Sequence, residues 1–189
     1  FIVVVDYTEY IRDVADSVLA CFTLPIDVDF EGENTKVYMH ACAGVAKAPD
    51  DSNDINELVR YADIAMFAAD KVVEDKIMFF SSELLQDLNR RITVESKLKE
   101  SLKNEYLYIV YQPQYAARDK SIRGFEALVR MKYPDGSGIS PGEFVPIAEK
   151  SGLVNQIDEY VMKHAMKEFK AMMDATGVKA VLAINISSH

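Results

Sequence analysis

The chain has 189 residues, of which 49% are hydrophobic and 27% are charged, and its formal net charge at pH 7 is −9. This length allows one ordinary domain or two small ones, and the composition is typical of a folded globular protein. No apolar run approaches the roughly 20 residues that span a bilayer. The acidic balance argues against general binding of DNA, RNA or acidic membranes, which needs a basic face. An anionic ligand could still bind through a cation or a local arginine.

The first 80 residues are predicted to alternate strands and helices, as in an α/β layer built on a sheet. Strands are expected at 1–5, 36–46 and 77–80. A helix of about four turns is expected around Tyr10, Val14 and Val18, which recur at helical spacing, and a second over the apolar stripe from Ile55 to Ala69. Because the chain opens on one apolar strand and closes on another, we expect it to be a piece of a longer protein.

Residues 81–105 contain no glycine or proline and are rich in Leu, Glu, Lys, Gln and Arg, which predicts one long polar helix. Helices of this kind commonly join domains, so we interpret this segment as a connector.

Residues 106–189 are predicted to hold three strands, at 107–114, 122–131 and 179–187. Two helices are expected between the last two strands. Ser140-Pro141-Gly142-Glu143 has the form of a capping box, which predicts the start of the first helix, and Gly152 its end. The second helix carries an apolar stripe and is closed by Gly177.

Three groups of polar residues on these strands are candidates for a site. Glu126, Leu128 and Arg130 lie two apart, so in an extended chain they share one face. Charged groups are costly in an apolar core unless they are paired or bound to a metal. The alternatives for this face are an internal salt bridge, the wet face of an edge strand, or a cation site beside a phosphate.

Asn185 and Ser187 share a face of the last predicted strand, and Gln112 lies where the first runs into Pro113. Each alone is also typical of an ordinary strand end. All of these residues and Glu126 lie towards the C-terminal part of a predicted strand, where ligands bind in α/β barrels and open α/β sheets. Carboxylate and amide oxygens suit a hard cation such as Mg2+ better than zinc. We therefore expect one ligand site that joins the three groups.

Four segments resemble the N-terminal part of an EAL domain: YQPQY, IRGFEALVRM, SPGEFVPIAEKSGLV and INISS. The resemblance covers about 106–189 and implies the first part of a TIM (β/α) barrel. It implies a domain that hydrolyses cyclic di-GMP to linear pGpG with Mg2+ or Mn2+. Further metal-binding acids and a lysine of the family belong to later segments, so we expect residues 1–189 alone to be inactive.

The resemblance also assigns roles to five residues. Glu126 and Asn185 would be metal ligands. Gln112, Leu128 and Arg130 would contact the substrate, with Arg130 at a phosphate and Leu128 on the guanine side of the pocket.

Residues 1–80 resemble the C-terminal half of a GGDEF domain, the family that makes cyclic di-GMP from GTP, through FIVVV, ACAGVA and ELVRYADIAMFAADK. Active relatives place a lysine at the position of Asp70 and Gly-Lys-Asn or similar near Val73-Glu74-Asp75. An acid at a position that faces nucleotide phosphates would repel them, which implies a degenerate, regulatory cyclase domain.

The expected whole is therefore a bacterial tandem GGDEF–EAL protein: an α/β GGDEF-like domain (1–80), a connector helix (81–105) and a truncated EAL domain (106–189). It would bind cyclic di-GMP in the cytoplasm and could form a homodimer. The parent protein could be anchored to a membrane through N-terminal segments that precede this chain. The alternative is a catalytically inactive cyclic di-GMP receptor that signals through the connector helix.

Overall fold

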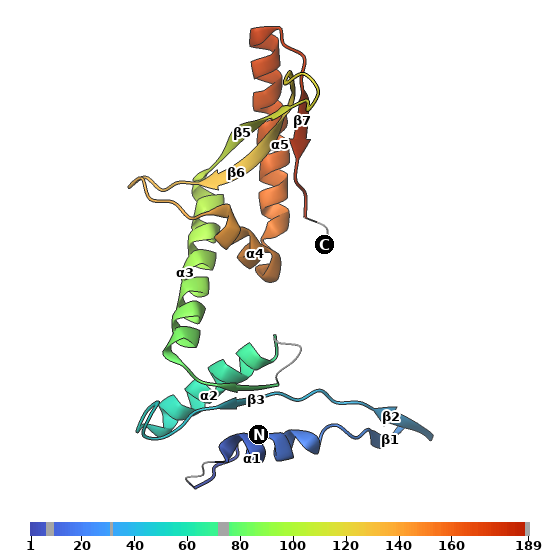
Figure 1. Ribbon diagram of the computed structural model, residues 1–189, viewed down its shortest axis with the longest axis vertical. Coiled ribbons are helices and arrows are strands. Elements are labelled where there is room, and N and C mark those ends of the chain that lie inside the picture. Colours follow the sequence, from blue (N-terminus) through green and yellow to red (C-terminus); the bar gives the residue numbers. More distant parts are fainter. Residues whose placement is uncertain (7–9, 31, 72–75, 188–189) are drawn as a thin grey trace. The chain divides into compact units, whose positions relative to one another are not determined.

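The computed structural model describes residues 1–6, 10–30, 32–71 and 76–187. The chain divides into two compact units, Phe1–Leu88 and Asn89–His189, and each is treated by itself below. The division falls within α3 (Ser82–Asn104), the helix interpreted above as a connector (Figure 1). No helix in the described ranges combines the length and the apolar character that crossing a membrane requires.

The first unit packs a helix on a short parallel pair of strands. It begins with α1 (Ile11–Ala20) and a hairpin of β1 (Ile26–Phe30) and β2 (Glu33–Val37). β3 (Ala43–Val45) then pairs in parallel with β4 (Ile77–Phe79), and α2 (Ile55–Ala69) lies between them in the chain. Gly44 is needed where β3 meets α2, because a Cβ there would lie 1.9 Å from the carbonyl oxygen of Ala62.

Several predictions for this unit are wrong. Residues 1–5 form no strand, and Phe1 to Val5 are exposed, because no described strand pairs with them. The strand expected at 36–46 is two strands, since β2 ends at Val37 and β3 begins only at Ala43. The hairpin strand β1 was not predicted, and α1 is 10 residues long, shorter than four turns. The helix at 55–69 and the strand near 77–80 are confirmed.

The second unit is a three-stranded sheet with helices on one face. β5 (Leu107–Tyr115), β6 (Ile122–Met131) and β7 (Val181–Ile184) lie in the order β5-β6-β7, with β5 antiparallel and β7 parallel to β6. α4 (Pro141–Ser151) and α5 (Val154–Thr176) connect β6 to β7. Odd-numbered residues of β5 and β6 enter the core with residues of α3, α4 and α5, among them Leu98, Phe144 and Ile157.

The mixed helix and strand content predicted for this unit is confirmed, with two local corrections. α4 starts after Ser140 and ends at Gly152, but the side chain of Ser140 makes no capping hydrogen bond, so the predicted capping box is not formed. Glu143 pairs with Arg90 of α3 instead. β7 ends at Ile184, so Asn185 and Ser187 follow the strand rather than lying in it.

Candidate functional site

Strand register brings three predicted site residues together on one face of the sheet. Gln112 of β5 is the Cα partner of Glu126 in β6, and Glu126 is the Cα partner of Ala183 in β7. Asn185 lies two residues beyond Ala183, and its Nδ2 donates a hydrogen bond of 2.8 Å to Oε1 of Glu126. The two residues predicted as metal ligands are therefore in direct contact.

Gln112 lies beside Glu126 because of strand pairing, and not because it is at the C-terminal end of its strand, as predicted. β5 runs antiparallel to β6, so its C-terminal end lies at the other end of the sheet from those of β6 and β7. The expectation that three C-terminal strand ends meet is therefore wrong for β5. Residues that are directly opposite in an antiparallel pair nevertheless share one face, and this pairing sets Gln112 beside Glu126.

Leu128 and Arg130 continue the same face of β6, because alternate residues of a strand point the same way. Both are half-buried, and Nη1 of Arg130 donates to the carbonyl oxygen of Val129 over 2.8 Å. Among the described residues no ion pair joins Arg130 to Glu126, so the alternative of an internal salt bridge is wrong.

A cleft of about 440 Å³ lies between the C-terminal half of β6, the residues after β7, and the helices α4 and α5. Leu128, Arg130 and Asn185 line it, whereas Gln112 and Glu126 lie outside its lining. Asp158 of α5 also lines the cleft, and its Oδ2 accepts a hydrogen bond of 3.0 Å from the backbone N–H of Ser187. Sequence reasoning missed Asp158, because a lone acid on a helix gives no signal that sets it apart from an ordinary surface residue.

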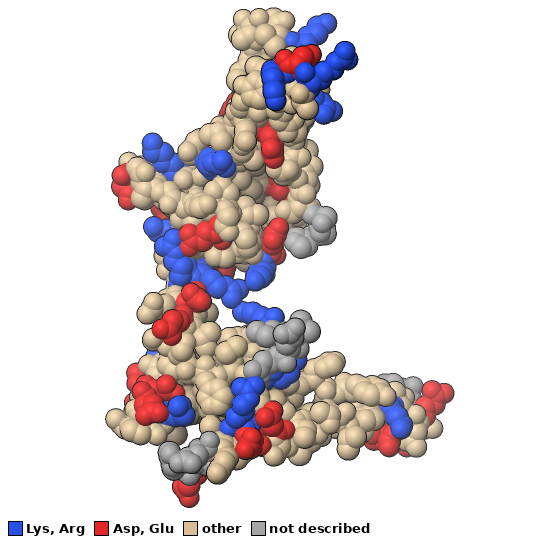
Figure 2. Space-filling model, in the orientation of Figure 1, with Lys and Arg blue, Asp and Glu red and all other residues tan. Residues whose placement is uncertain are grey.

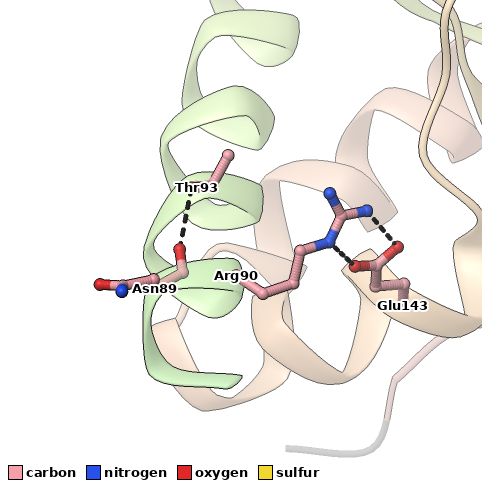
Figure 3. Close-up of polar contacts among 4 residues, drawn as sticks. All are labelled: Asn89, Arg90, Thr93 and Glu143. Atoms are coloured by element: carbon pink, nitrogen blue, oxygen red, sulfur yellow. Dashed lines mark hydrogen bonds and ion pairs between the residues drawn. The ribbon is translucent and has the colours of Figure 1, made fainter. Parts of the chain in front are cut away.

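A bidentate ion pair between Arg90 and Glu143 joins α3 to α4. Nε of Arg90 donates to Oε1 of Glu143 over 2.5 Å, and Nη2 donates to Oε2 over 2.9 Å (Figure 3). The hydrogen bond from Arg90 lowers the pKa of Glu143 below its ordinary value. Because Pro141 and Val145 of α4 line the cleft, this pair connects α3 to one of the cleft walls.

The two units differ in charge. Residues 1–88 hold 18 acidic and 6 basic side chains, whereas residues 89–189 hold 12 acidic and 15 basic ones. Lysine and arginine side chains gather at the end of the second unit where α5 ends (Figure 2). The acidic excess of the whole chain thus belongs to the first unit, and the unit with the candidate site carries no excess of negative charge that would repel an anionic ligand.

The donors of the candidate site suit a hard cation but form only part of a coordination sphere. Within the described ranges, no group of three or more His, Cys, Asp or Glu side chains could hold a metal ion. Glu126 and Asn185 together offer carboxylate and amide oxygens, whereas Mg2+ takes about six oxygen ligands and usually keeps several waters.

Comparison with known proteins identifies the family. Residues 95–189 match the model of the EAL domain. The signaling protein YkoW of Bacillus subtilis (strain 168) is 34% identical over 146 residues, which are 77% of this chain and 18% of that protein. The bifunctional diguanylate cyclase/cyclic di-GMP phosphodiesterase MucR of Pseudomonas aeruginosa is 31% identical over 153 residues, 81% of this chain and 22% of that protein.

A solved structure of the PaMucR phosphodiesterase in complex with c-di-GMP is 34% identical and covers 50% of this chain and 38% of that one, with a TM-score of 0.46. The chain thus spans about a fifth of the length of the curated relatives it matches. Because the model of the EAL domain matches residues 95–189, which are half of the chain, the chain belongs to the EAL domain family.

Proposed function

We propose that the protein acts in cyclic di-GMP signalling as a metal-dependent phosphodiesterase that hydrolyses cyclic di-GMP to linear pGpG. Membership of the EAL family and the activity named for MucR support this function. The observation that carries it is the contact between Asn185 and Glu126, because it brings an oxygen-bearing side chain of β6 against one from the residues that follow β7.

In this proposal Glu126 and Asn185 hold Mg2+ or Mn2+, and a cation bound by both would replace their present N–H···O contact. Such a cation, when bound, lowers the pKa of a coordinated water and offsets negative charge on the phosphate. Arg130 binds a phosphate oxygen, since a guanidinium matches phosphate geometry. Leu128 packs against a guanine at the cleft, and Gln112 donates a hydrogen bond to the substrate beside Glu126.

Residues 1–80 serve, in the same proposal, as a GGDEF-type regulatory domain, joined to the EAL domain by the connector at 81–105. The matches to YkoW and MucR support this, because they run over 146 and 153 residues and so extend upstream of residue 95. Asp70 ends α2 with an acid where active cyclases place a lysine. Residues 73–75, the second departure from the cyclase pattern, lie outside the described residues.

The test is turnover of cyclic di-GMP by the full-length protein with Mg2+, with Mn2+ and with a chelator. Glu126→Gln should lower turnover by at least about 100-fold, because loss of even an outer partner of a metal site costs 10–100-fold. Glu159→Gln, an exposed acid on α5, is the matched control and should retain activity.

The 189 residues alone are expected to show no turnover. Binding of labelled cyclic di-GMP by the full-length protein without turnover under any metal would refute the enzyme and support the receptor instead.

A further inference from the structure

The segment that carries Asn185 lies beyond the paired residues of β7. The parallel ladder between β6 and β7 extends only from the pair Gly124 and Val181 to the pair Ala127 and Ile184. Asn185 follows directly after this ladder and is exposed. Its place beside Glu126 therefore needs a further anchor downstream of β7.

Asp158 supplies such an anchor. Its Oδ2 accepts the backbone N–H of Ser187 at 3.0 Å, two residues beyond Asn185. Asp158 itself lies on a rigid element, because its neighbours Ile157 and Val161 are buried in the core of the second unit. A charged acceptor makes a hydrogen bond roughly twice as strong as a neutral one.

We propose that Asp158 is a positioning residue for the candidate site: by holding the backbone of Ser187, it keeps the amide of Asn185 over the carboxylate of Glu126. The inference deepens the proposed function and rests on it for the metal that the two side chains would share. In this role Asp158 touches neither the cation nor the substrate.

The geometry indicates how the effect would be transmitted. Two residues span at most about 7 Å of extended chain, so a shift of Ser187 is passed to Asn185 with little slack. Without the bond to Asp158, residues 185–187 would extend beyond the last paired residue of β7. Among the side-chain hydrogen bonds of the described residues, the one from Asn185 to Glu126 would then remain to hold this segment. The amide would then sample other orientations, and the cation would lose a preformed ligand.

The experiment measures Mn2+ affinity by electron paramagnetic resonance in the full-length protein, together with kcat and KM for cyclic di-GMP. Asp158→Ala should weaken Mn2+ binding by about 10-fold, as outer partners of metal ligands do, and lower kcat more than it raises KM. Asp158→Asn should lie between the wild type and Asp158→Ala, because its amide oxygen can still accept from Ser187 but carries no charge. Glu159→Gln, the next residue of α5, should change neither quantity.

Ser187→Pro removes the donated N–H and tests the same bond from the other side, so it decides the matter if Asp158→Ala does not fold. Wild-type Mn2+ affinity in Asp158→Ala or in Ser187→Pro would overturn the proposal. Asp158→Asn as weak as Asp158→Ala would overturn it too, since the charge rather than the acceptor would then be required. If Glu126→Gln leaves Mn2+ affinity unchanged, the proposed function fails instead.

Discussion

Replacing Gly124 by alanine should weaken the pairing of β6 with β7. A Cβ at Gly124 would lie 2.4 Å from the carbonyl oxygen of Val181, below the 3.0 Å that real Cβ atoms essentially never breach. Ordinary contact begins at 3.4 Å, so the strands would have to separate by about 1 Å. A ladder hydrogen bond of about 2.9 Å would lengthen to about 3.9 Å, beyond its normal range.

The expected cost is about 1–3 kcal/mol, the usual penalty for forcing a methyl group into a packed position. For a unit of this size each 1 kcal/mol corresponds to about 4–8 °C in Tm, so the second unit should melt at least about 4 °C lower. The same shift would carry Ala183 and Asn185 away from Glu126, because Glu126 lies only two residues from Gly124. Mn2+ affinity should therefore fall together with Tm.

Calorimetry of the wild type and the variant measures the Tm of this unit. Gly142→Ala is the matched control: its added Cβ would meet Ser140 Oγ at 3.7 Å, without a clash, and alanine is the better helix former. The control should keep or raise the Tm. An unchanged Tm and Mn2+ affinity in Gly124→Ala, or an equal loss in the control, would refute the reasoning.

Three further substitutions test the packing of the second unit by urea unfolding. Arg90→Gln removes the partner that lowers the pKa of Glu143. A lowered pKa in the folded state adds stability above the ordinary pKa of 4.5, and this stability is lost as the pH falls through the folded-state pKa. The wild type should therefore lose stability more steeply than the variant over this acidic range. Tyr133→Phe removes the hydroxyl that donates to the Lys97 carbonyl oxygen at 2.9 Å and should cost about 1 kcal/mol. Phe144→Ala leaves a cavity at a position with 0% exposure and should lower the free energy of unfolding by about 3–5 kcal/mol. A loss below about 1 kcal/mol is smaller than buried Phe→Ala changes produce and would contradict the place of Phe144 in the core.

Helices were the part of the fold that the sequence predicted well, because their signals are local. The apolar stripe of α2 lies within 15 residues, and Gly152 and Gly177 adopt the left-handed conformation that closes α4 and α5. Strands were predicted less well, since a strand exists only where a distant segment pairs with it. The apolar residues 1–5 have no described partner, whereas β1, which carries two aspartates, is paired along its length.

The candidate site was predictable in its residues but only partly in its geometry. Alternation placed Glu126, Leu128 and Arg130 on one face of β6, as expected. The direction of β5 was also within reach, because only six residues separate β5 from β6, and a parallel pair needs a connection of a dozen or more. The capping-box pattern at Ser140 predicted the start of α4 correctly, but the side chain of Glu143 pairs with Arg90, 53 residues away in the sequence, instead of capping the helix. Such long-range pairings depend on which surfaces meet after folding.

The antiparallel register of β5 has a consequence for the order of folding. Gln112 and Glu126 are neighbours within one hairpin, a contact of short sequence separation, whereas Asn185 contacts Glu126 across 59 residues. Closing the longer loop costs about 1.3 kcal/mol more in chain entropy than closing the hairpin, and isolated hairpins form in about 1–10 μs. The β5–β6 hairpin, which carries Gln112, Leu128 and Arg130, can therefore form early in folding. The contact between Glu126 and Asn185, which would hold the metal, forms only when the whole second unit folds.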